Sequence, residues 1–172
     1  VLPGVGPEVE GDAALREAVA AALAKATAAV DAIAIDEAAA AGIDIVRAVD
    51  GFIERTQPFR LAQDEARHAE LGTILYHCAE SLRVASLILW PVLPTQIEAF
   101  WKACGHNYAT RIAAGGGEIR SWAQWGGSKE GAPFEKVALF PRYKPPVSDL
   151  PAPKQAKAPK APKEKKAPKV KA

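Results

Sequence analysis

The stretch LGTILYHCAESLRVASLIL, residues 71–89, decides the fold predicted for this chain. Its apolar residues recur at spacings of three and four, which places them along one face of an α-helix and not on the alternating faces of a strand. These positions are Leu71, Ile74, Leu75, Cys78, Leu82, Ala85, Ile88 and Leu89. The helix is expected to end before Pro91, because proline lacks the backbone N–H that a helix interior requires. The stretch therefore predicts a long helix in the core of the protein.

Two helical segments are predicted before this stretch. Asp12 is expected to cap the first, whose apolar residues between 15 and 30 share one face. Ile33 is expected to continue the apolar stripe into the second segment, which reaches residue 53 and is broken at Pro58.

One more helix is predicted at residues 93–105, LPTQIEAFWKACG, with Gly105 at its C-terminal cap. The helical period is lost after Gly115-Gly116-Gly117, and no alternating strand pattern is found. The expected fold class is all-α, an antiparallel bundle of four or five helices with a non-helical C-terminal wrap. The expected domains are a connector, the bundle with its wrap, and a disordered tail, at residues 1–11, 12–143 and 144–172.

The small net charge of +2 conceals an uneven distribution. Residues 150–172 contain eight lysines and one glutamate, a net charge of +7, so the remaining 149 residues carry −5. Regular prolines and few apolar side chains predict an extended, self-repelling tail. The tail is expected to be a solvated linker, a nonspecific nucleic-acid arm that displaces phosphate counterions, or both.

Several features bear on cellular location and completeness. Cys78 and Cys104 occupy apolar helical positions, which predicts reduced core thiols in a cytoplasmic protein. No apolar run reaches the roughly 18 residues of a membrane span, and the first residues lack the pattern of a signal peptide. The sequence contains no methionine, so we expect it to be a piece of a longer protein.

Signs of catalysis are weak. Glu65 and His68 have the spacing used in di-iron bundles, but neither His77 nor His106 has a glutamate three residues earlier to supply the second half of such a site. No phosphate loop, GxSxG motif or cysteine–histidine cluster is present. We therefore expect no catalytic residue, no metal site and no cofactor in this chain.

The segment WAQWGG, residues 122–127, contains the strongest candidate for binding. A tryptophan beside glycines can approach an unstacked base, and single-stranded RNA loops are read by such stacking. Trp125 is either this stacking residue or a lid over the bundle. Trp122 is expected to pack, and Trp90 and Trp101 to lie in the core.

Four segments resemble the C-terminal part of bacterial methionyl-tRNA synthetases, and the resemblance spans residues 12–143. They are ERTQPFRLAQDE (54–65), LYHCAESLRVASLILWPVLPTQIEAFWKACG (75–105), WGG (125–127) and LFPRY (139–143). The helical part is similar to several class I synthetases, whereas the last two segments narrow the resemblance to the methionine enzyme. Phe59, Asp50 and Phe52 depart from the residues usual in the family, which suggests a divergent lineage.

The resemblance implies an anticodon-binding bundle. It implies that Trp125, flanked by Gly126 and Gly127, stacks on the first anticodon base of tRNA(Met). Arg142 is expected either to contact phosphate or to cap a helix end, and Phe140 is expected in the core. In the family, a preceding helix also reads the anticodon, a separate catalytic domain uses ATP with Mg²⁺, and a tail often leads to an OB-fold module. On this resemblance the sequence contains neither that helix, nor the catalytic domain, nor the OB-fold module, and its lysine-rich tail resembles the linker that leads to that module.

We therefore expect the anticodon-binding region of a methionine–tRNA ligase, with catalysis carried out elsewhere in the parent enzyme. The alternative is a free-standing helical RNA- or DNA-binding protein that uses its lysine-rich tail as an arm. A third reading, a purely structural bundle, predicts no tRNA binding even at low salt.

Overall fold

The structure of this chain is a computed structural model that describes residues 1–116 and 118–142. The chain divides into two units, Val1–Phe140 and Pro141–Ala172. The helices described all belong to the first unit. Of the second unit the structure describes Pro141 and Arg142, whose side chains are exposed.

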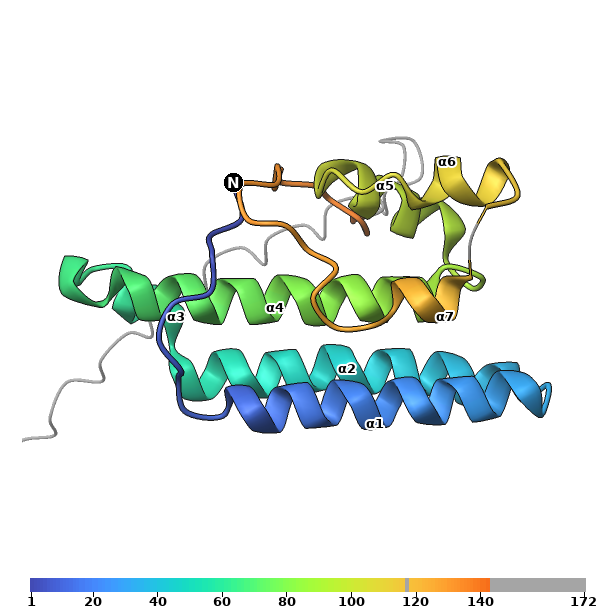
Figure 1. Cartoon of the computed structure of the whole chain (residues 1–172), viewed down its shortest axis with the longest axis horizontal. Helices are drawn as coiled ribbons and strands as arrows, with labels where there is room; N and C mark the ends of the chain where they lie inside the picture. Colours follow the sequence, from blue (N-terminus) through green and yellow to red (C-terminus); the bar gives the residue numbers. More distant parts are fainter. Residues whose placement is uncertain (117, 143–172) are drawn as a thin grey trace, which may run out of the picture. The chain divides into compact units, whose positions relative to one another are not determined.

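Three long helices form the body of the first unit. They are α1 (Asp12–Asp31), α2 (Ile35–Thr56) and α4 (His68–Leu89). Consecutive helices of this set run in opposite directions, and α2 packs against both of the others (Figure 1). Among the described residues there is no strand. The predicted all-α antiparallel bundle is confirmed.

Shorter helices cover the remaining sides of α4. The single-turn helix α3 (Pro58–Leu61) and the 3-10 helix η1 (Glu65–Arg67) join α2 to α4. Helices α5 (Pro94–Ala103) and α6 (Tyr108–Ala113) lie on the side of α4 opposite α1 and α2 (Figure 1). The four-residue helix α7 (Ile119–Trp122) lies beside α4, although the sequence predicted no helix after the glycine triplet.

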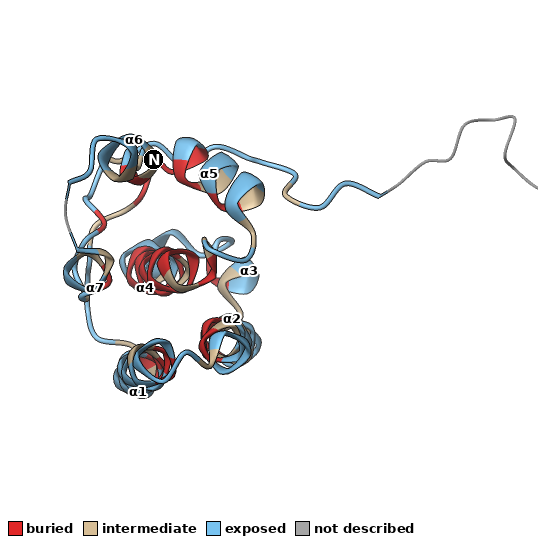
Figure 2. Cartoon of the chain, turned by 90° about the vertical axis from the view of Figure 1, so that its right-hand side faces the viewer, coloured by how far each residue is buried: buried red, intermediate tan, exposed pale blue. Residues whose placement is uncertain are grey.

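Helix α4 is the centre of the unit, and Figure 2 shows it buried on almost every side. Its apolar residues pack with α1, α2 and α5 in one core cluster. The most deeply buried large apolar side chains of this cluster are Leu15, Ile45, Phe52, Ile74, Val84, Leu87 and Trp101. Full burial of one such side chain stabilises the fold by roughly 1.5–3 kcal/mol. Leu75, placed on the core stripe by its spacing, is instead 42% exposed.

The first residues of the chain pack onto α4 together with the C-terminal wrap, which is the irregular segment that follows α7. Leu2 is buried with Tyr76 and Ala79. The Leu2 N–H donates to the Ala132 carbonyl at 2.8 Å, and the Gly131 N–H donates to the Leu2 carbonyl at 2.9 Å. Leu2 thus ties the start of the chain to residues 131 and 132, and residues 1–11 belong to the first unit.

Other sequence expectations have mixed outcomes. Cys78 and Cys104 are free and buried, as predicted, and burial raises the pKa of each thiol to about 11. Trp101 is buried, and Trp90 is half-buried and stacks on it. The placement of Phe140 in the core is wrong, because its side chain is 69% exposed.

The predicted cap of α1 is displaced by one residue. Gly11 is the N-cap, with φ of 85°, and Asp12 is the first helical residue. The Asp12 side chain is buried and accepts a hydrogen bond from the Val9 N–H at 3.4 Å. It therefore fixes the turn that leads into the helix and does not cap the helix.

Ile33 ends the first helix instead of extending its apolar stripe. Its φ is 61°, in the left-handed region, and its side chain is 84% exposed. The Ile33 N–H donates to the Val30 carbonyl at 3.0 Å, and the Ala34 N–H donates to the Ala29 carbonyl at 2.8 Å. This is the Schellman pattern, in which glycine is the preferred residue at the left-handed position.

We expect Ile33→Gly to raise the free energy of unfolding by about 1 kcal/mol, because a left-handed conformation costs a β-branched residue about 1–2 kcal/mol. The matched control is Ile43→Gly, at a half-exposed position within α2, which should lower stability because glycine weakens a helix interior. Urea denaturation of both variants measures the difference. A loss of stability at both positions would show that the left-handed isoleucine carries no strain.

Candidate nucleic-acid interface

The backbone of residues 126–128 is held against α4 by one buried carboxylate. Glu80 Oε1 accepts hydrogen bonds from the Gly126 N–H at 2.7 Å and the Gly127 N–H at 2.9 Å. Glu80 Oε2 accepts from the Ser128 N–H at 2.9 Å. Successive backbone N–H groups of this kind form an anion-binding concavity. Here the anion is a side chain of the protein itself.

Arg83 completes this arrangement from one turn further along α4. Its guanidinium donates to both carboxylate oxygens of Glu80, at 2.6 and 2.9 Å. It also donates to the Trp122 carbonyl, to the Gln124 carbonyl at 2.6 Å and to the Tyr108 hydroxyl at 3.0 Å. Glu80 and Arg83 thus bind residues 122–128 through both N–H and carbonyl groups, and we call this pair the clamp.

The clamp is charged although it is fully buried. Burial alone would raise the pKa of Glu80, but the hydrogen bonds and charge of Arg83 and the donors of Ser128 and Gly127 lower this pKa to about 2. Burial alone would lower the pKa of Arg83, but Glu80 raises it above its ordinary value. Both groups therefore stay ionised at neutral pH. Such a pair is costly to bury and still more costly to break.

Gly126 and Gly127 are each required at their positions, for different structural reasons. Gly126 has φ of 94°, a conformation that residues with a side chain rarely adopt. A Cβ atom on Gly127 would lie 2.5 Å from Cζ of Arg83, so only glycine fits this close to the clamp. The pair of glycines after Trp125 is therefore required by the geometry of the clamp.

Trp125 is half-buried at the edge of this segment. Its ring meets His77 edge-on, with centroids 5.7 Å apart and planes at 65°. His77 is buried, its Nδ1 has no hydrogen-bond partner among the described residues, and Asp12 Oδ2 is 4.0 Å away. Burial lowers the pKa of His77 despite the opposing charge of Asp12, so the imidazole beside Trp125 is neutral at pH 7.

Trp122 packs against side chains of helix α6. Its ring stacks on Tyr108 with centroids 5.4 Å apart, and the Arg111 guanidinium lies 4.0 Å from the ring centroid. This position agrees with the packing role that the sequence predicts for Trp122.

These side chains surround an open hollow of about 320 Å³. The lining consists of Tyr108, Arg111, Ser121, Trp122, Gln124, Trp125, Gly126 and Gly127. The predicted site residues Trp125, Gly126 and Gly127 therefore lie together. Arg142 belongs to the second unit, where its side chain is exposed. The hollow combines aromatic rings with a cation, which suits a nucleotide.

The sequence analysis did not single out the residues of the bundle that support or line this hollow. Glu80 and Arg83 are charged residues inside an otherwise apolar helix, three positions apart. That placement is a usable signal, because a fully buried charge requires a partner. Tyr108 and Arg111 lie on the short helix α6, which has no strong apolar period to reveal it.

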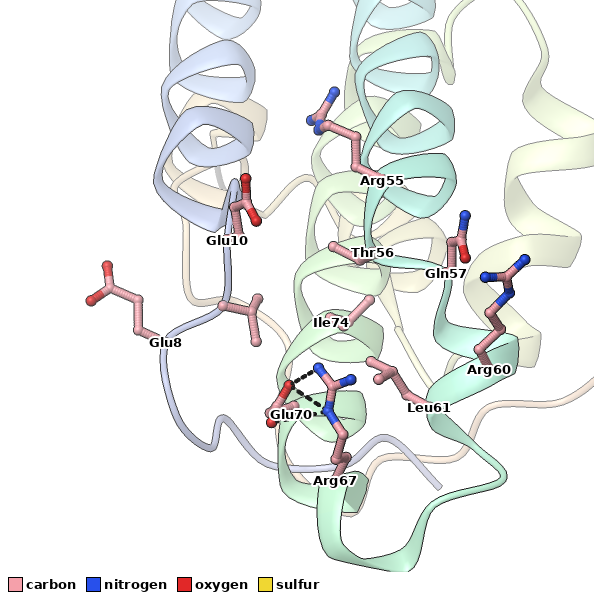
Figure 3. Close-up of a pocket in the computed structure, with 11 residues that line it drawn as sticks. Glu8, Glu10, Arg55, Thr56, Gln57, Arg60, Leu61, Arg67, Glu70 and Ile74 are labelled. Carbon is pink, nitrogen blue, oxygen red and sulfur yellow. Dashed lines mark hydrogen bonds and ion pairs between the residues drawn. The ribbon is translucent and has the colours of Figure 1, made fainter.

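A larger depression lies near the end of α2 and the start of α4, and Figure 3 shows its lining side chains. Its volume is about 820 Å³, and its charged residues are Glu8, Glu10, Arg55, Arg60, Arg67 and Glu70. Arg67 is already paired with Glu70. Three carboxylates balance three guanidinium groups, so this depression has little net attraction for a phosphate.

Two further observations concern metals and membranes. The described residues, 1–116 and 118–142, bring together no group of three or more His, Cys, Asp or Glu side chains that could hold a metal ion. Within the same residues, every helix is too short or too polar to cross a membrane.

No family model matches this chain. The chain is 34% identical over 102 residues to a methionine–tRNA ligase from Streptomyces coelicolor, covering 58% of the chain and 19% of that protein. A methionine–tRNA ligase from Deinococcus radiodurans is 31% identical over 121 residues, covering 70% of the chain and 17% of that protein. The chain thus spans less than a fifth of the length of these curated relatives.

The fold is also similar to a solved structure, the apo form of Mycobacterium tuberculosis methionyl-tRNA synthetase. The TM-score is 0.67 at 27% identity, and the match covers 84% of this chain and 28% of the other. The chain is homologous to a part of bacterial methionyl-tRNA synthetases, which confirms the resemblance predicted from its sequence.

We expect Glu80→Gln to lower the free energy of unfolding by about 3–5 kcal/mol, because it leaves the charge of Arg83 buried and uncompensated. The matched control is Glu70→Gln, which removes the carboxylate from a solvent-exposed pair with the same sequence spacing. That control should leave stability nearly unchanged. Urea denaturation followed by circular dichroism measures both. Equal transition midpoints for the two variants would refute a structural role for the clamp.

Proposed function

We propose that this chain is the anticodon-binding region of a methionine–tRNA ligase and that it selects tRNA(Met) through the hollow beside Trp125. The observation that carries this proposal is that the ring of Trp125 is held in a fixed position and remains partly exposed. The clamp fixes the backbone on its C-terminal side, and the ring lies half-exposed beside a cation in a region homologous to methionyl-tRNA synthetases.

The chemistry of the hollow supports an RNA loop as the ligand. Anticodon bases are single-stranded, so a protein can stack an aromatic ring on a base that has left the helix. Such a stack gains most when the ring is held in place before binding, because less conformational entropy is then lost. Glu80 and Arg83 provide this rigidity, since they fix the backbone on both sides of Trp125.

Trp125 is the residue to which we assign the base stack, with Gly126 and Gly127 allowing the strand to approach closely. Arg142 is proposed to contact phosphate. The basic tail is proposed to add nonspecific affinity for RNA, because clustered lysines release counterions from phosphates.

Methionine activation is assigned to other parts of the parent enzyme, where ATP and methionine are the substrates. The described residues offer no cluster that fits the magnesium ion of that reaction. We therefore derive no step of activation or transfer from these side chains. The proposed contribution of this chain is the choice of tRNA, within a cytoplasmic enzyme.

We expect Trp125→Ala to weaken binding to the tRNA(Met) anticodon stem-loop by about 1–3 kcal/mol, the usual loss for one base–aromatic stack. Binding can be measured by fluorescence anisotropy with labelled RNA. Trp125→Phe should retain part of the affinity because it keeps an aromatic face.

Trp122→Ala is the matched comparison, since both tryptophans belong to the same segment. It should lower the melting temperature more than Trp125→Ala does, because its ring stacks on Tyr108. A stem-loop with altered anticodon bases serves as the RNA control. Equal affinity for both stem-loops, or binding unaffected by Trp125→Ala, would contradict the proposed function.

A further inference from the structure

Arg111 is a second feature of the hollow, and its side chain is positioned by stacking. Its Cζ atom lies 4.0 Å from the centroid of the Trp122 ring. The ring of Trp122 also stacks on the ring of Tyr108, with centroids 5.4 Å apart and planes at 26°. Tyr108 is in turn hydrogen-bonded to Arg83 of the clamp. Arg111 is thus connected to the buried core through a chain of contacts, although its own side chain is exposed.

The donors of Arg111 are available for a ligand. A guanidinium that stacks through its flat face still has N–H groups directed outward in its plane, and these match phosphate oxygens. The ion pairs found among residues 1–116 and 118–142 do not include Arg111. By contrast, Arg83 below the hollow donates to Glu80 and to backbone carbonyls, so its donors are already used.

The electrostatic setting favours an anion at this point. Arg111 is the charged residue of the hollow's lining, and the other lining side chains are neutral. The carboxylate nearest to the segment, Glu80, is neutralised by Arg83. The hollow therefore has a net positive charge, unlike the larger depression, where acidic and basic side chains balance.

We infer that Arg111, supported on Trp122, binds a backbone phosphate of the RNA strand whose base stacks on Trp125. This inference rests on the proposed function for the identity of the strand. It assigns two different tasks to the two tryptophans: Trp125 contacts a base, and Trp122 holds the cation that contacts the phosphate. The volume of about 320 Å³ is of the size that ligand sites use for small groups.

The test is the salt dependence of binding, measured with the full chain and the anticodon stem-loop. Each phosphate contact on a single strand contributes about 0.7 to the slope of log K against log salt. Arg111→Gln should therefore reduce this slope by about 0.7 and weaken binding. Arg111→Lys should keep the slope, because the charge remains, yet bind more weakly than the wild type because the planar stack is lost.

Arg60→Gln is the matched control, because Arg60 is an exposed arginine in the charge-balanced depression of Figure 3. Its slope should equal that of the wild type. Near-UV circular dichroism verifies that each variant keeps its tertiary structure.

The outcomes separate this inference from the proposed function. An unchanged slope for Arg111→Gln, while Trp125→Ala still weakens binding, would overturn the phosphate contact alone. A reduced slope for Arg111→Gln on an unstructured RNA, with no preference between anticodons, would support the contact and reject anticodon selection. Absence of RNA binding by the wild type would overturn both.

Discussion

The ion pair between Glu80 and Arg83 is the interaction on which the packing of residues 122–128 against the bundle depends. A segment without regular secondary structure must still satisfy its backbone N–H and carbonyl groups when it packs on a core. In residues 122–128, the carbonyl groups of Trp122 and Gln124 and the N–H groups of residues 126–128 are satisfied by two side chains of α4. A well-packed apolar pair could match the stability of a buried ion pair. It could not supply both the acceptors and the donors that this backbone uses.

The same pair explains how a bundle can present a binding surface at its edge. Helix α4 is packed on several sides and is therefore rigid. Glu80 and Arg83 bind residues 122–128 to this helix, so that segment is held in place as well. Sites built on a rigid element hold their geometry better than sites on free loops. The hollow beside Trp125 is thus an extension of the core, with Tyr108 and Trp122 continuing the aromatic packing that begins at Trp101.

The sequence was most informative where the signal is periodic and local. The spacing of residues 71–89 predicted α4 and its end before Pro91, and Gly105 was correctly placed after α5. The expectation for Ile33 is wrong because the conformation of this residue depends on hydrogen bonds that close the helix end, and a β-branched side chain does not indicate a left-handed turn. The expectation for Phe140 is wrong because hydrophobicity alone does not show whether a side chain outside the helices packs against the core.

Part of the candidate site was also predictable from a local sequence signal. Trp125 and its glycines form a compact motif, so they could be singled out by residue type. The role of Glu80 could not, because its partners lie 46–48 residues further along the chain and come close only in the folded state. Arg111 gave no signal at all, since an exposed arginine on a short helix has many possible roles.

The pairing of Leu2 with Gly131 and Ala132 has a consequence for the order in which the protein folds. It closes a span of about 130 residues, whereas α1 meets α2 across a short turn. Loop-closure entropy delays contacts between distant residues until the nearer ones have formed. The wrap should therefore attach after the bundle has assembled and open before the bundle melts, as a separate cooperative unit. Faster hydrogen exchange at the backbone N–H groups of Gly126 and Gly127 than at that of Ile45 would reveal this order. The proposed RNA contact would then be made by the part of the protein that folds last.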